Sequence, residues 1–199
     1  MTEAERDEEL VRRFRAGEAE AFTRLVERHQ QRVFRLCLRV LSDREAAADV
    51  AQDTFITVLR KLDGFRGDAA FTTWLHRVAV NACYDELRRR RRRPALHVVD
   101  DEGRDHEPGP TIDDRAEEVA GTLDAAAALA TVAEEFRTAV VLADVQDLPY
   151  DEIARILDVP VGTVKSRVHR GRLALADALG ISDDHREPDA RSAASEQEP

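Results

Sequence analysis

Apolar side chains recur at helical spacing through the first half of the chain. They predict four helices, over about residues 5–16, 18–41, 42–62 and 71–92. The apolar face of the second helix consists of Phe22, Leu25, Val26, Val33, Leu36, Cys37 and Val40. The third helix opens at Ser42 with the Ser-x-x-Glu spacing of a capping box. Its apolar positions, spaced i, i+3, i+4 and i+7, are Phe55, Val58, Leu59 and Leu62.

The second half of the chain shows a shorter series of helical patterns. An alanine-rich helix is expected over about residues 114–130, and Thr131 opens another capping-box pattern ahead of an apolar helix. Two further helices, over residues 150–157 and from about 161 to 178, are separated by only a few residues. The apolar stripe of the last helix consists of Val161, Val164, Val168, Leu175 and Ala178. Two helices joined by so short a turn are typical of a helix-turn-helix.

Between and after these segments the helical pattern is lost. Residues 94–112 are rich in proline, glycine and acids, and residues 181–199 also lack an apolar period. The sequence therefore predicts an all-α protein with two small helical domains, over residues 1–93 and 113–180. A flexible acidic linker is expected to join them, and a disordered tail to follow.

Charge is unevenly distributed, which changes how the net charge of −10 is interpreted. Residues 1–93 carry a net +4 and end in six consecutive arginines, whereas residues 94–128 carry a net −8. Local charge decides where nucleic acid docks, so DNA binding is compatible with the acidic total, although the chain alone should bind DNA weakly. With no apolar run of bilayer length and an acidic N-terminus, a cytoplasmic protein without membrane insertion is expected.

The sequence gives little support for a metal site, a redox switch or an enzymatic activity. The histidines and acids of the linker could be imagined as a metal site, but a solvated linker is favoured because nothing holds them in one geometry. Cys37 and Cys83 lack a partner at metal-ligand spacing, so buried free thiols are expected, with a redox switch as the alternative. Residues 162–166 resemble a phosphate loop only faintly, and no nucleophile with a base is evident. No metal, cofactor or enzymatic activity is predicted.

The last predicted helix separates its apolar stripe from its polar side chains, as a DNA-reading helix requires. One polar face consists of Thr163, Ser166, Arg167 and Arg170. The other side of the stripe carries Lys165, His169 and Arg172. Such a helix can bury one face, offer polar and arginine side chains to base edges, and reach phosphates with its remaining cations. A solvated arginine-rich helix is the alternative, disfavoured by the presence of the turn and the first helix.

A second polar face lies on the fourth predicted helix. It consists of Arg77, Asn81, Tyr84 and Arg88, and it runs into the arginine series. Asparagine can read a base edge with two hydrogen bonds, and arginines can hold the backbone. The preceding glycine loop, residues 64–68, could accept an unstacked base. Phe71 and Trp74 are expected in the core, and a solvated helix end is the alternative for the arginines.

These stretches in this order resemble a bacterial sigma factor of the extracytoplasmic-function (ECF) group of the sigma-70 family, with a weak likeness to actinobacterial members. The motifs that carry the resemblance are Phe65-Arg66-Gly67-Asp68, Thr73-Trp74-Leu75, Val80-Asn81 and Pro160-Val161-Gly162-Thr163-Val164-Lys165-Ser166-Arg167. The resemblance covers residues 5–93 as region 2 and 115–178 as region 4. It implies a protein that binds core RNA polymerase, directs it to promoters and helps to melt the DNA.

The resemblance also implies a role for each surface. Asp49, Gln52 and Asp53, which by spacing alone are an ordinary solvated helix face, would bind the clamp helices of the largest polymerase subunit. The minus-10 element would be held and read by Phe65, Arg66, Gly67, Asp68, Arg77, Asn81, Tyr84 and Arg88. The minus-35 element would be contacted by Thr163, Lys165, Ser166, Arg167 and Arg170, with Lys165 on the phosphate side. The polymerase flap region and an anti-sigma factor are further implied partners.

The chain departs from the family pattern at two places. Val132-Ala133 stand where members often have Leu-Pro, and Tyr84-Asp85 stand where basic or polar residues are common. The second departure leaves the promoter bases read there open. The competing class is a stand-alone regulator with a ligand-sensing first domain, which is disfavoured because such a domain has no use for a second nucleic-acid face.

Overall fold

The computed structural model describes residues 3–92 and 125–181, and within these ranges all regular secondary structure is helical. The all-α fold with two small helical domains is therefore confirmed. The linker predicted over residues 94–112 and nearly all of the predicted tail lie outside the described residues, as does the start of the predicted alanine-rich helix. In the ranges that are described, no helix is long and apolar enough to cross a membrane.

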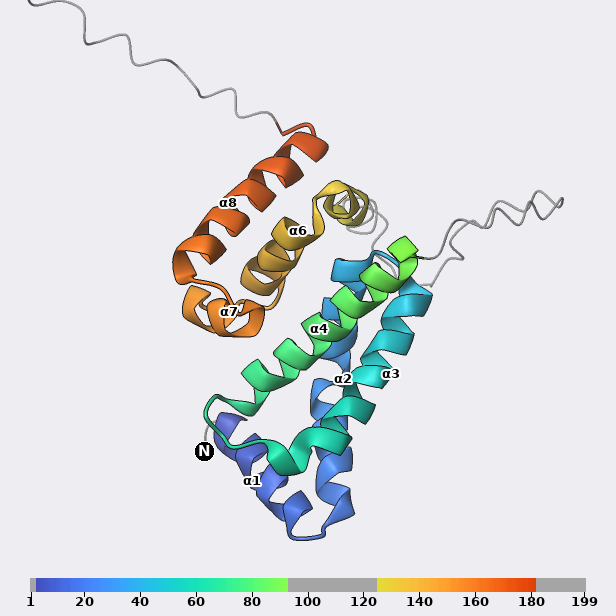
Figure 1. The fold of residues 1–199 in the computed structure, drawn as a ribbon, viewed down its shortest axis with the longest axis vertical. Helices are drawn as coiled ribbons and strands as arrows, with labels where there is room; N and C mark the ends of the chain where they lie inside the picture. Colours follow the sequence, from blue (N-terminus) through green and yellow to red (C-terminus); the bar gives the residue numbers. More distant parts are fainter. Residues whose placement is uncertain (1–2, 93–124, 182–199) are drawn as a thin grey trace, which may run out of the picture.

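The first half consists of the four predicted helices. They are α1 (Glu3–Arg15), α2 (Ala19–Leu41), α3 (Arg44–Lys61) and α4 (Phe71–Arg92). A short 3₁₀ turn (Leu62–Gly64) follows α3. The helices α2, α3 and α4 pack against one another, and α1 packs mainly against α2 (Figure 1). The apolar stripes read from the sequence thus meet in one core, in which Leu25, Leu36 and Val58 are fully buried.

The start of α3 differs from its predicted capping box by one residue. Ser42 adopts a left-handed conformation and ends α2, with its N–H bonded to the carbonyl of Leu38. Asp43 is the N-cap of α3, and its carboxylate accepts a hydrogen bond of 3.0 Å from the N–H of Ala46. The short turn leaves no room for Ser42 to serve both helices. Leu59, predicted on the core face, is 45% exposed, because α3 turns Ala47, Val50 and Thr54 inward instead.

The described part of the second half consists of four helices and a π-helical turn. After a helix over residues 125–131, the chain forms α6 (Glu134–Val140), the turn η2 (Val141–Val145), α7 (Tyr150–Leu157) and α8 (Val161–Ala178). The helices α7 and α8 are the predicted pair, and Asp158 reverses the chain between them in a left-handed conformation. The helix-turn-helix is therefore confirmed.

The capping box predicted at Thr131 is wrong. Thr131 still belongs to the preceding helix, and its hydroxyl donates to the carbonyl of Ala128 at 2.7 Å. The helix α6 begins only at Glu134, after Ala133, without a side-chain cap. Because the chain turns between Thr131 and Glu134, the Thr131 hydroxyl bonds to the preceding helix and cannot cap α6.

Gly171 sets how closely α8 approaches α6. A Cβ atom at this position would meet Val140 Cγ2 at 2.4 Å and the carbonyl oxygen of Phe136 at 2.9 Å. No other residue leaves room for the two backbones at this distance. The glycine lies between Arg170 and Arg172 in a helical stretch, and such an isolated glycine was the available signal for a close packing contact.

The two halves do not stand apart. The helix α4 packs against α7, and α2 contacts α6 and η2, so that α4 lies between the first-half helices and the helix-turn-helix (Figure 1). Buried residues of both halves form one continuous apolar cluster. This arrangement determines which of the predicted DNA-binding residues reach solvent.

Candidate nucleic-acid interface

The helix α8 presents most of its predicted polar residues at the surface. Val164 and Val168 are buried, while Lys165, Ser166 and Arg170 are exposed. The apolar stripe is shorter than predicted, because Val161 is 39% exposed and Ala178 is also exposed. Burial of the middle of the stripe holds the polar face outward.

Two arginines of α8 are already engaged by α6. Arg167 forms an ion pair of 2.8 Å with Glu135, and its side chain is only 23% exposed. The guanidinium of Arg170 lies over the ring of Phe136, 5.9 Å from its centre. Both side chains are therefore positioned before any ligand arrives, and Arg167 must leave Glu135 to bind a base fully.

Arg172 has a structural role that the sequence did not reveal. Its guanidinium forks onto the carboxylate of Asp144 in η2, through bonds of 3.1 Å and 2.6 Å. The hydrogen bond to Asp144 raises the pKa of Arg172 further above its usual range. This bidentate pair braces α8 against the π-helical turn, so Arg172 is not the freely available phosphate contact that the helix pattern predicted.

The glycine loop before α4 is built on an aromatic cluster. The ring of Phe65 is 8% exposed and packs edge-on against Phe71 and at 5.2 Å from Trp74. The carbonyls of Leu62 and Phe65 accept hydrogen bonds from Arg15 of α1. Phe71 is buried, as expected from the sequence, and Trp74 is partly buried. The aromatic rings therefore hold the loop in place from below.

The exposed part of the loop is its polar tip. Arg66 and Asp68 form an exposed ion pair of 3.2 Å, and Gly67 between them has a φ of +78°. The loop and the start of α4 line a cavity of about 320 Å³, together with Trp74, Arg77 and, from the second half, Arg155. A cavity of this size, with an aromatic wall and cationic rim, can accept a planar base.

The predicted polar face of α4 is only partly open. Arg77, Asn81 and Arg88 are exposed, but Tyr84 is half-buried beside Thr138 and Arg167 of the second half. Burial raises the pKa of the Tyr84 hydroxyl, although Thr138 and Arg167 lower it in part. The face is therefore interrupted at Tyr84 by the neighbouring domain and is open on both sides of it.

The arginine series is largely neutralised by the protein itself. Arg88 pairs with Asp85, Arg90 pairs with Glu86 and Asp43, and Arg91 pairs with Glu134 of α6 at 2.6 Å. Arg89 also pairs with Glu86. Asp85 and Glu86 stand three and four residues before their partners, a spacing that stabilises ion pairs on a helix. That spacing was the signal in the sequence, and it was missed.

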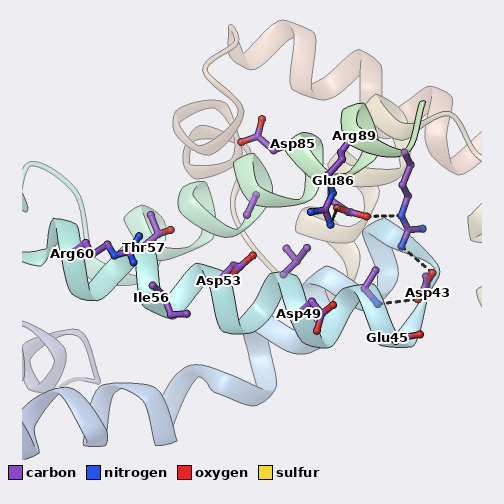
Figure 2. Close-up of a pocket in the computed structure, with 14 residues that line it drawn as sticks. Asp43, Glu45, Asp49, Asp53, Ile56, Thr57, Arg60, Asp85, Glu86 and Arg89 are labelled. Carbon is purple, nitrogen blue, oxygen red and sulfur yellow. Dashed lines mark hydrogen bonds and ion pairs between the residues drawn. The ribbon is translucent and has the colours of Figure 1, made fainter. Parts of the chain in front are cut away.

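The predicted polymerase patch is exposed but divided between two grooves. Asp49 and Asp53 line a groove of about 540 Å³ between α3 and α4, where Figure 2 shows them on the outer face of α3. Across the groove, Arg90 forms ion pairs with both Glu86 and Asp43. Burial alone would raise the pKa of Glu86, but Arg90 and Arg89 together hold it below its usual value.

The third member of the patch, Gln52, faces a different surface. It lines an apolar groove between α2 and α3, together with the exposed Ile56 and Leu59. The outer side of α3 therefore combines exposed carboxylates on one flank with apolar side chains on the other. Such a mixture is typical of a protein-binding surface.

A buried polar cluster inside the first half was not predicted. Asp7 accepts a 2.8 Å hydrogen bond from Nε2 of His29, and both residues are buried. His76 is also buried, and its Nδ1 has no hydrogen-bond partner among the described residues. Burial, helped by the charges of Arg32 and His29, lowers the pKa of His76 to about 4. His29 falls within the apolar spacing of α2, which was the signal for its burial.

The two cysteines are buried free thiols, as expected. A hydrogen bond with Cys37 and burial together raise the pKa of the Cys83 thiol. A thiol that stays protonated and inaccessible reacts slowly with oxidants. In the described part of the chain, no group of histidine, cysteine and acidic side chains is arranged to hold a metal ion. The linker histidines considered from the sequence lie outside it.

Comparisons with known proteins find similarity in both halves of the chain. Residues 25–93 match the family described as Sigma-70 region 2, and residues 123–175 match the family described as Sigma-70, region 4. The chain is 38% identical to the RNA polymerase sigma-H factor of Pseudomonas aeruginosa over 188 residues, which cover 90% of this chain and 96% of that protein.

Two further similarities cover most of the chain. The ECF RNA polymerase sigma-E factor of Escherichia coli is 38% identical over 184 residues, which cover 88% of this chain and 95% of that protein. Among solved structures, the sigma factor RpoE of Bartonella quintana, in complex with the anti-sigma factor NepR, has a TM-score of 0.66. It is 25% identical, and the match covers 82% of this chain and 99% of that one.

Proposed function

The chain belongs to the extracytoplasmic-function group of the sigma-70 family, and from that membership we propose which of its surfaces carry each step of promoter recognition. A sigma factor binds core RNA polymerase and directs it to specific promoters. Region 2 melts the minus-10 element, and the helix-turn-helix of region 4 reads the minus-35 element. Residues 1–93 form the region 2 domain in this proposal, residues 113–180 form the region 4 domain, and residues 94–112 link them.

The minus-35 element is contacted by the exposed face of α8. Lys165, Ser166 and Arg170 reach solvent on the second helix of the pair, the position from which such helices enter the major groove. Thr163 and Arg167 complete the surface once Arg167 leaves Glu135. Lys165 serves the phosphates, and the other side chains serve the bases.

The minus-10 element is held by the loop cavity and the open face of α4. The aromatic wall of the cavity stacks on a flipped base, while Arg66 and Asp68 line its mouth and Gly67 lets the loop turn. Arg77, Asn81 and Arg88 follow the strand along α4. The observation that carries the function best is this pairing of a base-sized cavity in one half with a helix-turn-helix in the other.

The function is tested by start-site mapping. Purified core polymerase is incubated with genomic fragments, with and without the chain, and the 5′ ends of the run-off transcripts are mapped. We expect a set of starts that appears only when the chain is added, each preceded by shared minus-10 and minus-35 sequences. Identical starts with and without the chain would contradict the function.

Polymerase binds the outer side of α3 through Asp49, Gln52 and Asp53. The carboxylates and the neighbouring apolar groove are both exposed in the free chain, which suits a large protein partner. Asp53→Ala is expected to weaken co-purification with core polymerase several-fold, while Glu20→Ala, the loss of an exposed carboxylate on α2, leaves it unchanged. Equal recovery with both variants would exclude this surface.

Two finer features complete the proposal. The chain acts in the cytoplasm as a DNA-binding initiation factor without catalytic activity of its own. It is also held inactive by an anti-sigma factor, as the Bartonella quintana relative is captured in complex with one. Co-expression of the chain with a candidate anti-sigma factor, followed by co-purification, tests the second feature.

A further inference from the structure

The loop that forms one wall of the base-sized cavity has little backbone support of its own. Residues 64–69 all line the cavity, and two of them are glycines. In the described chain, the backbone of residues 66–69 makes no hydrogen bond to another backbone group. The ring of Phe65 packs on Phe71 and Trp74, but ring packing does not fix the direction of the peptide groups. A glycine-rich loop without polar contacts samples many conformations.

Arg15 supplies polar contacts to this loop from outside it. Its Nη2 donates hydrogen bonds to the carbonyl oxygens of Leu62 at 2.7 Å and Asp63 at 3.1 Å, and also to that of Phe65. Leu62 and Asp63 belong to the 3₁₀ turn after α3, where the last carbonyls of a helix lack partners and carry partial negative charge. A guanidinium is suited to this place, because it satisfies the carbonyls and complements their charge.

The bond to Phe65 also fixes the first peptide group of the exposed tip. In a planar trans peptide, the carbonyl oxygen and the N–H of the next residue point in opposite directions. Because Arg15 holds the Phe65 carbonyl toward α1, the N–H of Arg66 points away from α1. Arg15 itself lines no part of the cavity, so it can affect a bound base only through the loop.

The helix α1 gives Arg15 a firm attachment. Leu10 and Val11 are buried in the core, and Asp7 accepts the buried 2.8 Å hydrogen bond from His29 of α2. Arg15 is the last residue of this helix. Its guanidinium therefore extends to the loop from a helix that is fixed to the core, and the loop is held from two sides, by aromatic rings and by a cation.

The neighbouring cations of α1 are engaged elsewhere. Arg12 pairs with Glu9 on the same helix, and its side chain is 77% exposed, while Arg13 pairs with Glu18. We propose that Arg15 is a positioning residue for base capture, which holds the loop in the shape that accepts the flipped base of the minus-10 element. A loop that is ordered before binding loses less conformational entropy when the base enters. This inference rests on the proposed function, because it concerns the same cavity.

Four variants separate this role from the general effects of a lost charge. Arg15→Ala and Arg15→Met both remove the guanidinium, and the second keeps an apolar stem of similar length. Arg15→Lys is the rescue variant, because three carbonyls that converge on one nitrogen can also be met by the three donors of an ammonium group. Arg12→Ala is the matched control, since it removes a cation of the same helix that pairs with Glu9.

The first measurement reports the loop in the free protein. Trp74 is the single tryptophan of the chain, and its ring lies 5.2 Å from that of Phe65. Acrylamide quenching of its fluorescence is expected to rise about twofold in Arg15→Ala and Arg15→Met, and to stay at the wild-type level in Arg15→Lys and Arg12→Ala. Far-UV circular dichroism should be the same for all, because Arg15 is exposed. Wild-type quenching in both loss variants would overturn the inference.

The second measurement links the loop to the base. Run-off transcription uses the full chain, core polymerase and a promoter found by start-site mapping, with single minus-10 bases removed to leave abasic sites. The wild type should lose at least tenfold at the position of the captured base. Arg15→Ala should lose at least tenfold on intact DNA, and Arg15→Lys less than threefold. On the abasic DNA Arg15→Ala should match the wild type, because the loop then has no base to hold.

The outcomes are distinct. If Arg15→Ala loses as much activity on the abasic DNA as on intact DNA, Arg15 supports the fold or contacts phosphates directly, and the inference is overturned. Arg15→Lys as impaired as Arg15→Ala would overturn it too. Failure of the proposed function looks different, because the wild type would then direct no new starts, or would show no minus-10 position where removal of the base matters, whatever the quenching of Trp74.

Discussion

Both halves of the molecule present polar helix faces, but the hydrophobic core beneath these faces is much larger in the first half than in the second. Among the described residues, ten of the twelve largest fully buried side chains belong to the first half, and the other two, Leu142 and Ile153, belong to the second. The long helices α2, α3 and α4 bury one another, whereas α6 and α7 are short, and α7 packs against α4 as well as against α8. The first half therefore has the larger core, and the stability of the second half depends on close packing of a few side chains.

The difference teaches how each half positions its DNA-binding residues. In the first half a buried aromatic cluster holds an exposed loop, so its polar tip is free to contact a ligand. In the second half the arginines of α8 also brace the domain, through Glu135, Phe136 and Asp144. Substitutions of DNA-binding residues should therefore affect DNA reading alone in the first half, but both DNA reading and stability in the second.

The largest effect is expected in the core of the first half. Phe71 is 2% exposed and contacts the rings of Phe65, Trp74 and His29. Phe71→Ala should lower the free energy of unfolding by about 3–5 kcal/mol, because it leaves a cavity beneath both the loop and α4. Urea denaturation measures the loss. Ile56→Ala, at a 39% exposed site on α3, is the control and should cost less than half as much; equal losses would contradict the comparison.

The buried histidine of the same core makes its stability depend on pH. The pKa of His76 is about 4 in the folded chain and about 6.5 when exposed, so the unfolded chain takes up the proton first as pH falls. The contribution of neutral, buried His76 to the free energy of unfolding is fully present above about pH 6.5 and is lost as the pH falls from 6.5 to 4. It amounts to about 3 kcal/mol, since one pKa unit corresponds to about 1.4 kcal/mol.

Replacement of the imidazole isolates this effect. His76→Leu removes the titrating group and the buried Nδ1, so the unfolding free energy of the variant should fall less steeply than that of the wild type in this window. The measurement is urea denaturation at several pH values between 4 and 7. Parallel curves for the two proteins would show that His76 does not titrate as inferred.

In the second half, the close approach of α6 and α8 is the sensitive feature. Gly171→Ala places a methyl group against Val140 and the carbonyl of Phe136, and should destabilise the domain by about 1–3 kcal/mol. Gly162→Ala is the matched control on the same helix, because a Cβ there meets nothing within 4 Å. Thermal unfolding of both variants decides the point. A loss of stability in Gly162→Ala as large as that in Gly171→Ala would contradict this interpretation.

The smallest effect concerns DNA reading rather than stability. Arg167→Ala removes a base contact worth about 1–3 kcal/mol, and we expect the lower end, because Glu135 competes for the same guanidinium. Run-off transcription should drop about fivefold at promoters that depend on the minus-35 element, with normal polymerase binding. Arg172→Ala is the contrast, since its loss should lower the melting temperature of the domain more than promoter selectivity. Unchanged selectivity with Arg167→Ala would remove this residue from the minus-35 set.

Local patterns in the sequence predicted the helices well, and the sites less completely. The periods and breakers located α1 to α4, α7 and α8 within a few residues, because helix formation depends on near neighbours. The N-caps of the two predicted capping boxes differ from the observed ones by one and two residues, since the choice of cap depends on how the chain turns between packed helices. The brace between Arg172 and Asp144 joins segments 28 residues apart, and no local pattern reports such a contact.

By itself, the sequence determined the all-α fold, the helix-turn-helix and the existence of two polar, cation-bearing helix faces, because each follows from the spacing of residues within one helix. Only the tertiary structure decided which of those side chains are available. The pairing of Arg91 with Glu134, the burial of Tyr84 beside Arg167 and the place of Arg155 at the loop cavity all join the two halves of the chain. Such contacts depend on how helices distant in the sequence pack together, and helical spacing carries no information about that packing.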